Sequence, residues 1–393
     1  MRQAFALRGP MVVPGSAVVE NGLVVVEGTA IVFAGAEQEY AGVLPDQVTS
    51  VQNGWICPGF IDMHMHGIGG HDTMDGTEES LQAISGALVR FGVTSFLATT
   101  MTAPLDRLAE VVENVSAVSR LGTKGASIAG IHLEGPWINP RYKGAQNEEH
   151  IVSPELEQAK RLYELSDGLI KVVTIAPEQP GALETIRFFK EQGVIVSAGH
   201  TGATFAQAKQ AVDCGVEHFT HCFNAMTGMH HREPGVAGAA MYFERLSTEL
   251  IADGEHVHPA VMSILYRVKK ASRLALVSDS MRATGLEQGV YELGGQPVHV
   301  DGGRAALADG TLAGSILTLN RAVRNMVVLC GVTLPDAVAM ASQTPAKILG
   351  LSDRKGRLAA GYDADITILA ESFEVAACYV NGRLAYERKE GSN

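Results

Sequence analysis

The sequence contains few cysteines for its 393 residues, and they are odd in number and widely spaced. The five are Cys57, Cys214, Cys222, Cys330 and Cys378. Small disulfide-stabilised secreted domains need a denser cysteine pattern, and cysteine zinc sites need CxxC-like spacing. The pattern therefore argues against both classes and favours a reducing cytoplasm as the location of the protein.

Long hydrophobic runs and basic clusters are also missing. No apolar run reaches the ~18 residues that a membrane-spanning helix needs. The opening segment, MRQAFALRGPMVVPG, lacks an apolar core followed by a small-residue cleavage site, so we expect no signal peptide. The formal net charge is −12, and Lys and Arg are scattered. We therefore expect no nucleic-acid or membrane partner, and an anionic substrate would need a local cationic site.

The chain is long enough, and with 46% hydrophobic residues apolar enough, for one large core and a smaller one. Short strands separated by glycine-containing turns are predicted at both ends, in residues 17–35, 361–369 and 375–387. We therefore predict a discontinuous small β domain, a β-sandwich made of residues 1–57 and 350–393. Residues 58–349 would form the catalytic domain.

The middle of the chain alternates short apolar strands with helical segments. Eight strands are predicted, at residues 55–64, 93–100, 126–135, 169–178, 193–201, 217–225, 248–256 and 273–280. Helical stretches between them include residues 80–92, 105–122 and 182–193. An eightfold strand–helix alternation predicts an α/β protein with a (β/α)₈ TIM barrel. The alternative is an open doubly wound sheet, but the GxGxxG turn that would favour it is missing.

Side chains able to bind metal stand at the ends of six of these strands, where the active site of such a barrel lies. They are His64, His66, His132, Glu134, His200, His218, His221, Asp253, His256 and Asp279. Because side chains alternate along a strand, His64 and His66 share one face. Any one of these residues is open to a structural, hydrogen-bonded role. Imidazoles and carboxylates that converge on one rim, however, predict a site for Zn, Fe, Mn or Co.

Several motifs resemble those of the amidohydrolase superfamily. They are PGFIDMHMHG, HLEGPW, GHTGA, HCFNAM, REPG, ADGEH, VSDSMRATG and ADGTLAGS. Together they resemble the N-acetylglucosamine-6-phosphate deacetylase family over the whole chain. This resemblance implies a metal-dependent barrel with a small β domain built from both termini. It also implies hydrolysis of N-acetyl-D-glucosamine 6-phosphate to D-glucosamine 6-phosphate and acetate, in amino-sugar catabolism or cell-wall recycling.

The resemblance also implies roles for individual residues. The implied metal ligands, for two divalent ions per subunit with Glu134 bridging, are His64, His66, Glu134, His200, His221 and Asp279. Asp279 also matches the catalytic aspartate, which would take a proton from the attacking water and deliver it to the departing nitrogen. The implied substrate-binding residues are Gln146, Asn224, Ala225, Arg232 and His256.

Two of these substrate-binding residues carry further expectations. Arg232 matches an arginine that reaches the phosphate of the neighbouring subunit, so a homodimer or a dimer-based tetramer is expected. Gln146 stands where many members of the family have histidine. Glutamine can donate to a sugar hydroxyl or a phosphate, but it cannot carry a proton.

Two alternatives follow from the same motifs. One is another amidohydrolase, either an N-acyl-amino-acid deacylase or a cyclic amidase of the hydantoinase or dihydroorotase kind. Many cyclic amidases have a carboxylated lysine at the bridging position, and Glu134 at that position counts against them. The other is a non-catalytic scaffold, which would be expected to have lost ligands that this chain keeps.

Overall fold

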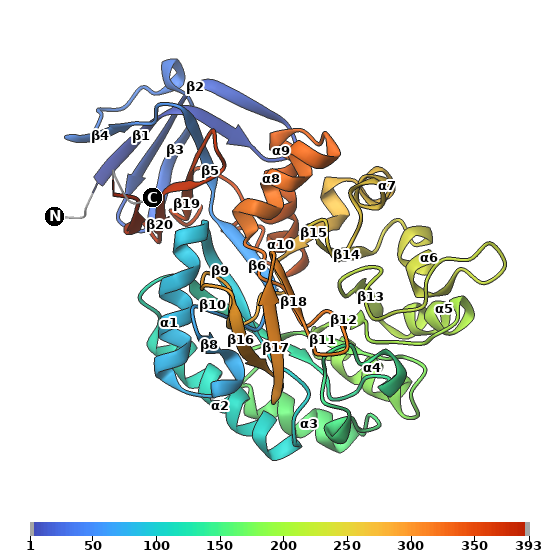
Figure 1. The fold of residues 1–393 in the computed structure, drawn as a ribbon. Coiled ribbons are helices and arrows are strands. Elements are labelled where there is room, and N and C mark those ends of the chain that lie inside the picture. The colour runs from blue at the N-terminus through green and yellow to red at the C-terminus, as the bar shows by residue number, and fades with distance from the viewer. Residues whose placement is uncertain (1–3, 390–393) are drawn as a thin grey trace.

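The computed structural model describes residues 4–389, which form a helix-wrapped barrel and a sheet built from both ends of the chain (Figure 1). The barrel has eight parallel strands, hydrogen-bonded in chain order. They are β6 (Phe60–Met65), β9 (Val93–Thr99), β10 (Ser127–Glu134), β11 (Ile170–Ile175), β12 (Ile195–Ala198), β13 (Val216–Phe219), β14 (Ser247–Ile251) and β15 (Leu274–Val277). The (β/α)₈ prediction is confirmed.

The last barrel strand is joined to the first just beyond its end. The backbone N–H of Asp279 donates to the carbonyl oxygen of His64 at 2.8 Å. The backbone N–H of Ser278 donates to Oδ1 of Asp62 at 3.3 Å. These contacts bring the carboxyl ends of β6 and β15 together, so the side chains that follow the two strands meet on one rim.

Helices cover the outside of the barrel (Figure 1). They are α1 (Glu78–Leu88), α2 (Leu105–Leu121), α3 (Leu156–Leu165), α4 (Ala182–Glu191), α5 (Phe205–Cys214), α6 (Gly235–Tyr242), α7 (Pro259–Lys269), α8 (Leu319–Cys330), α9 (Leu334–Ala341) and α10 (Gln343–Ile348). In α2, Leu108, Val111, Val115 and Val118 recur at helical spacing and are buried. No helix among residues 4–389 is long and apolar enough to cross a membrane.

The two ends of the chain form one eight-stranded sheet. Its strands are β1 (Ala4–Val13), β2 (Ala17–Glu27), β3 (Ala30–Ala36), β4 (Gln47–Ser50), β5 (Gly54–Pro58), β19 (Ile366–Ala370), β20 (Val375–Val380) and β21 (Arg383–Glu387). The two halves meet where β5 pairs antiparallel with β19. Phe5 and Leu7 pack into a cluster on one face, and Ala6 packs into a cluster with Leu23 on the other. The proposed domain limits begin at residue 1 and end at residue 393, and residues 1–3 and 390–393 lie outside the described residues.

The single strand predicted at residues 55–64 is two strands, β5 in the terminal sheet and β6 in the barrel. Gly59 separates them and donates from its backbone N–H to the carbonyl oxygen of Asp365 at 2.8 Å. A Cβ atom at Gly59 would lie 2.2 Å from Oγ1 of Thr94, so only glycine fits this close approach. Between β5 and β6, the chain therefore passes from the terminal sheet into the barrel at a single residue, Gly59.

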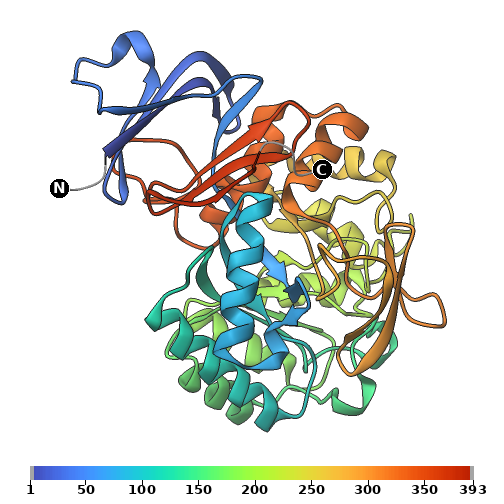
Figure 2. The same ribbon diagram turned by 60° about the vertical axis from the view of Figure 1, so that its left-hand side comes forward.

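A small sheet between β15 and α8 was not predicted from the sequence. It is formed by β16 (Gly289–Leu293), β17 (Gln296–Asp301) and β18 (Arg304–Ala306), and it projects beside the barrel (Figure 2). A two-stranded piece, β7 (Gly67–Ile68) with β8 (His71–Asp72), follows β6. Leu293 at the end of β16 lines the cavity at the carboxyl ends of the barrel strands.

Candidate active site

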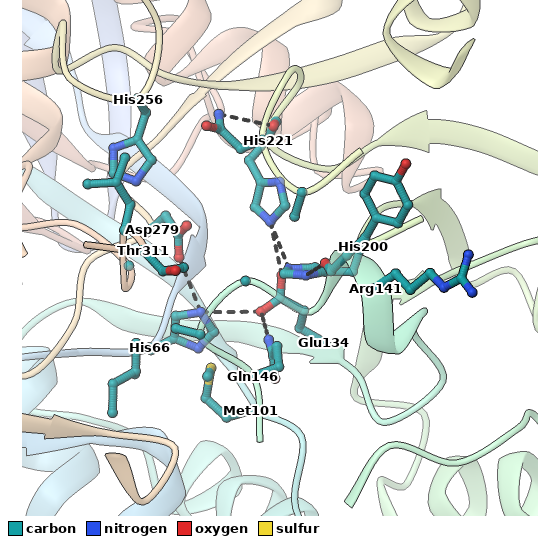
Figure 3. Close-up of a pocket in the computed structure, with 18 residues that line it drawn as sticks. His66, Met101, Glu134, Arg141, Gln146, His200, His221, His256, Asp279 and Thr311 are labelled. Carbon is teal, nitrogen blue, oxygen red and sulfur yellow. Dashed lines mark hydrogen bonds and ion pairs between the residues drawn. The ribbon is translucent and has the colours of Figure 1, made fainter. Parts of the chain in front are cut away.

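A cavity of about 340 Å³ lies at the carboxyl ends of the barrel strands (Figure 3). It is lined by most of the predicted site residues, namely His66, Glu134, Gln146, His200, His221, Asn224, Ala225, His256 and Asp279. His64 is fully buried beside them and contacts Glu134 and Asp279. Of the predicted site residues, only Arg232 lies away from this cluster.

The six predicted metal ligands form two groups of three, and in each group the ligand atoms lie within 4.8 Å of one another. The first group is His64, His66 and Asp279. Oδ1 of Asp279 lies 3.2 Å from Nε2 of His66 and 3.6 Å from Nε2 of His64. These side chains come from the end of β6 and from the residues just after β6 and β15.

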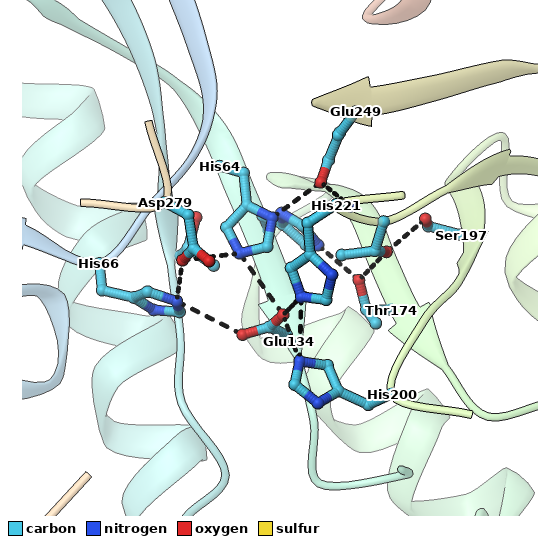
Figure 4. Close-up of polar contacts among 12 residues, drawn as sticks. His64, His66, Glu134, Thr174, Ser197, His200, His221, Glu249 and Asp279 are labelled. Atoms are coloured by element: carbon cyan, nitrogen blue, oxygen red, sulfur yellow. Dashed lines mark hydrogen bonds and ion pairs between the residues drawn. The ribbon is translucent and has the colours of Figure 1, made fainter. Parts of the chain in front are cut away.

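The second group is Glu134, His200 and His221. Oε1 of Glu134 lies 3.1 Å from Nε2 of His200 and 3.3 Å from Nε2 of His221. The same carboxylate also faces the first group, at 3.4 Å from Nε2 of His64 through Oε1 and 3.4 Å from Nε2 of His66 through Oε2 (Figure 4). Glu134 therefore occupies the position of a bridge between the two groups.

Three of the six residues have a positive φ, which is uncommon for residues other than glycine: 46° at His200, 23° at His221 and 48° at Asp279. Such conformations persist only where the surroundings hold them. At His200, Nδ1 donates to the carbonyl oxygen of Tyr142 at 2.9 Å. At His221, the backbone N–H donates to Oε2 of Glu249 at 3.0 Å. The strained residues all point their side chains into the cluster, which marks it as a functional site.

The electrostatics of the cluster favour a positive charge. Burial lowers the pKa of His66, but hydrogen bonds and charge from Asp279 and Glu134 outweigh it and raise the pKa to about 10. Burial likewise opposes protonation of His64, yet Glu249, Glu134 and Asp279 raise its pKa well above the ordinary value. Carboxylates thus converge on imidazoles that would otherwise be neutral.

The residues fit a divalent metal ion. Imidazole nitrogens and carboxylate oxygens are the ligands that Zn²⁺ and similar ions prefer. Nε2 of His64 is buried and has no hydrogen-bonding partner among residues 4–389, although it faces Glu134 and Asp279. A cation between these atoms would satisfy the nitrogen and neutralise the carboxylates.

Gln146 is held by the protein at both ends of its amide. Nε2 donates to Oε2 of Glu134 at 2.7 Å, and Oε1 accepts the backbone N–H of Thr102 at 2.7 Å. Its side chain is buried at the cavity wall. The structure therefore places Gln146 against the carboxylate of Glu134.

His256 is oriented by Asp253, which comes from the same loop after β14. Nδ1 of His256 donates to Oδ2 of Asp253 at 2.6 Å, and the backbone N–H of His256 donates to Oδ1 at 2.8 Å. Burial lowers the pKa of His256, but the hydrogen bond and charge of Asp253 outweigh it and raise the pKa. Because Nδ1 is occupied, Nε2 is the nitrogen that remains for a substrate in the cavity.

Asn224 and Ala225 line the cavity after β13. Nδ2 of Asn224 donates to the carbonyl oxygen of His221 at 3.3 Å, and the carbonyl oxygen of Ala225 accepts the N–H of Thr201 at 3.0 Å. Arg232, in the loop between β13 and α6, is exposed and donates from Nη1 to Nε2 of His231 at 2.7 Å. The cavity of one chain is thus not reached by its own Arg232.

Sequence analysis missed two residues at this site. Arg141 lines the cavity and, among residues 4–389, makes no ion pair. Glu249 lies in the fully buried strand β14 and contacts His64, His218 and the backbone of His221. The available signal for Glu249 was a charged residue within the otherwise uncharged stretch STELI.

His132 and His218, predicted among the residues at the strand ends, have structural hydrogen bonds below the cavity. Nε2 of His132 pairs with Oγ1 of Thr174 at 2.8 Å, and Nδ1 of His218 pairs with Oγ of Ser247 at 2.7 Å. Burial lowers the pKa of His132 to about 3, so this imidazole is neutral. These two histidines therefore have the structural, hydrogen-bonded role that is the alternative to metal binding.

Comparison with known proteins matches residues 55–385 to the family model described as the amidohydrolase family. N-acetylglucosamine-6-phosphate deacetylase of Bacillus subtilis (strain 168) is 40% identical over 99% of both chains. N-acetylgalactosamine-6-phosphate deacetylase of Escherichia coli O157:H7 is 41% identical over 87% of this chain and 90% of its own. The crystal structure of N-acetyl-D-glucosamine-6-phosphate deacetylase from Mycobacterium smegmatis superposes with a TM-score of 0.91 at 32% identity, covering 97% of this chain and 100% of that one. This chain belongs to the amidohydrolase family.

Proposed function

We propose that the protein is a metal-dependent hydrolase that removes the acetyl group from N-acetyl-D-glucosamine 6-phosphate. The products are D-glucosamine 6-phosphate and acetate. The observation that carries this proposal is the position of Asp279 and Glu134 among four imidazoles at the floor of a cavity of about 340 Å³. Relatives that are 37–41% identical over most of the chain, with that activity in their names, support the substrate.

The proposed metal centre holds two divalent ions of Zn, Fe, Mn or Co. One would be held by His64, His66 and Asp279, and the other by Glu134, His200 and His221, with Glu134 bridging. When bound, such an ion lowers the pKa of a coordinated water to about 7 and polarises a carbonyl group. An acetamide needs both effects, because it is a poor electrophile with a poor leaving group.

Asp279 moves the proton in this proposal. Burial raises the pKa of its carboxyl, but the charges of His64, His66 and His221 outweigh it and hold the pKa below the ordinary value. In this role Asp279 accepts a proton from the attacking water and then delivers it to the departing nitrogen. Such a shuttle contributes typically ~10²–10⁴-fold in rate.

His256 and the loop after β13 would orient the substrate. Nε2 of His256, fixed by Asp253, would donate to the acetyl oxygen as negative charge develops on it. Asn224 and Ala225 would hold the sugar phosphate at the cavity wall, and Arg232 from a second subunit would pair with it. This arrangement requires a homodimer or a dimer-based tetramer, which we propose to act in the cytoplasm.

Acetate release tests the proposal directly. Protein of measured metal content is incubated with N-acetylglucosamine 6-phosphate, with N-acetylglucosamine, and with N-acetylgalactosamine 6-phosphate, the substrate named for one relative that is 41% identical. We expect the fastest turnover on the first sugar, loss of activity after chelation, and recovery with added metal. Faster turnover on the galacto epimer would reassign the substrate. Metal-loaded protein that releases no acetate from either phosphorylated sugar would refute the proposal.

A further inference from the structure

Glu249 is a buried carboxylate on β14 that contacts a residue of each group of the proposed metal centre (Figure 4). Its Oε2 accepts from Nδ1 of His64 at 2.9 Å and from the backbone N–H of His221 at 3.0 Å. His64 belongs to the first group of ligands and His221 to the second. One side chain on β14 therefore connects residues that are far apart in the chain.

The contact with His64 selects one tautomer of the imidazole. An ionised carboxylate can only accept hydrogen bonds, so Nδ1 of His64 must carry the proton of this hydrogen bond. When the ring binds a metal ion it is neutral, and its lone pair is then on Nε2, which lies 3.4 Å from Glu134 and 3.6 Å from Asp279. Carboxylates that bind the far nitrogen of a metal-ligating histidine orient the ring in this way and raise its basicity as a ligand.

The contact with His221 supports a strained backbone. The φ of His221 is 23°, and its N–H donates to Glu249. The backbone carbonyl oxygen of Glu249 also accepts the N–H of Cys222 at 3.0 Å. Side chain and backbone of Glu249 thus fix the turn that aims the His221 ring at Glu134.

The other oxygen of Glu249 is anchored, so the carboxylate has a single orientation. Oε1 faces Nε2 of His218 at 3.3 Å, and Nδ1 of His218 pairs with Oγ of Ser247 at 2.7 Å. Glu249 and His218 are fully buried. An ionised group in such a place is costly unless it is paired, and packing alone would be served by an apolar side chain.

We propose that Glu249 is a positioning residue that fixes the tautomer of His64 and thereby sets the metal affinity of the group His64, His66 and Asp279. The inference rests on the proposed metal centre, but it concerns a residue outside that centre. It predicts that metal binding at one of two sites depends on a carboxylate that touches neither ion.

Metal binding by the Glu249→Gln variant tests this inference without any sugar substrate. Glutamine keeps the shape but removes the charge and one of the two acceptors. Glu217→Gln is the matched control, because Glu217 lies in the neighbouring strand β13, pairs with Lys190 and is partly exposed. Metal-free wild-type and variant proteins are titrated with Zn²⁺ against a chromophoric chelator.

We expect the control to bind two ions with wild-type affinities. In Glu249→Gln, one of the two sites should bind about 10–100-fold more weakly, while the other changes less. A general loss of negative charge would instead weaken both sites equally, and this outcome would overturn the positioning role. Two sites of wild-type affinity in Glu249→Gln would overturn it as well.

A second measurement is made on the wild-type protein, and a variant is needed only to assign the signals. Histidine ring nitrogens are labelled with ¹⁵N in the Zn²⁺-loaded protein, and His64→Asn identifies the signals of His64. We expect a proton on Nδ1 and none on Nε2, whereas a proton on Nε2 would refute the proposal. Because neither experiment measures acetate release, failure of the deacetylase proposal and failure of this inference give different results.

Discussion

Nε2 of Gln146 donates a hydrogen bond of 2.7 Å to Oε2 of Glu134. The other end of the amide accepts the backbone N–H of Thr102, so both of its hydrogen-bonding groups are used within the protein. Many members of the family that this sequence resembles have histidine at this position. Histidine can carry a proton, and glutamine cannot. In this chain Gln146 therefore orients the carboxylate of Glu134, the proposed bridge between the two metal ions, and its contact with substrate remains a prediction.

Replacing Gln146 by leucine separates the two roles. The variant leaves Oε2 of Glu134 and the N–H of Thr102 without these partners, and a hydrogen bond to a charged group is worth about 1.5–3 kcal/mol. We expect kcat to fall by roughly 10-fold or more. Steady-state kinetics on N-acetylglucosamine 6-phosphate checks this, and a rise in KM with unchanged kcat would instead identify Gln146 as a substrate-binding residue.

The His64→Asn, His66→Asn double variant tests the binuclear arrangement. Removal of two imidazoles leaves the first group with Asp279 alone, while Glu134, His200 and His221 remain. We expect metal content to drop by about one ion per chain, measured by elemental analysis after dialysis. An unchanged metal count would reject the second ion and leave the deacetylase proposal standing.

Asp279→Asn should remove the proton shuttle. We expect kcat to fall by at least ~10²-fold with a much smaller change in KM. Because Asp279 also belongs to a proposed ligand group, the metal content and melting temperature of the variant must be measured alongside. Near wild-type turnover by a folded, metal-loaded variant would show that another group carries the proton.

Arg232→Ala should weaken binding of the phosphate. Loss of a charge-assisted pair worth roughly 1.5–3 kcal/mol would raise KM for the phosphorylated sugar by about one to two powers of ten. Turnover of unphosphorylated N-acetylglucosamine should barely change, which provides the control. The exposed position of Arg232, outside the cavity of its own chain, is the reason to expect that it acts on a second subunit.

Mixing the Asp279→Asn and Arg232→Ala variants tests this arrangement across subunits. In a mixed dimer of Asp279→Asn and Arg232→Ala subunits, the site with intact Asp279 receives the intact Arg232 of its partner. We expect one site per mixed dimer to regain tight binding of the phosphorylated sugar. No recovery despite demonstrated subunit exchange, or a fully active monomer, would place the action of Arg232 elsewhere.

The pair of Asp253 and His256 should make stability depend on pH. Burial opposes the charge of both groups, but their mutual contact raises the pKa of His256 and lowers the pKa of Asp253. The contribution of His256 is fully present below its ordinary pKa of 6.5 and is lost as pH rises through its raised value. The contribution of Asp253 is present above its ordinary pKa of 3.8 and is lost as pH falls through its lowered value.

Urea unfolding of wild type and Asp253→Asn measures this contribution. At pH 6 both partners are charged, and we expect the variant to be less stable by about 1–3 kcal/mol. The difference should shrink as pH rises through the raised pKa of His256. A difference that stays constant from pH 6 to pH 10 would mean that the ion pair contributes nothing beyond its neutral hydrogen bonds.

The sequence was sufficient to predict the barrel because each of its strands is a short apolar run, and six of the eight end in chemically distinctive residues such as His200 or Asp279. The sequence was insufficient where the role of a side chain depends on how far along the barrel axis it lies. Period-two alternation predicts which face a side chain is on, but not whether it reaches the cavity, as for His66, or stays below it, as for His132. Glu249 was missed for this reason, since its partners come from strands distant in sequence.

The boundary between two strands was missed where a single close contact determines it. The close approach of Gly59 to Thr94 divides one apolar run into strands of two different sheets, and an apolar run does not reveal such an approach. The contact that we propose between Arg232 and a phosphate on a second subunit is equally hidden in the sequence of one chain.

The pairing of β5 with β19 has a consequence for synthesis on the ribosome. Pro58 emerges about 300 residues before Ile366, which at ~5–20 residues per second is a delay of roughly 15–60 s. During that time one edge of β5 has no neighbour, and unpaired strand edges are templates for aggregation. Nascent chains that terminate early, before Ile366, should therefore depend on chaperones, and fragments ending there should be insoluble when overproduced.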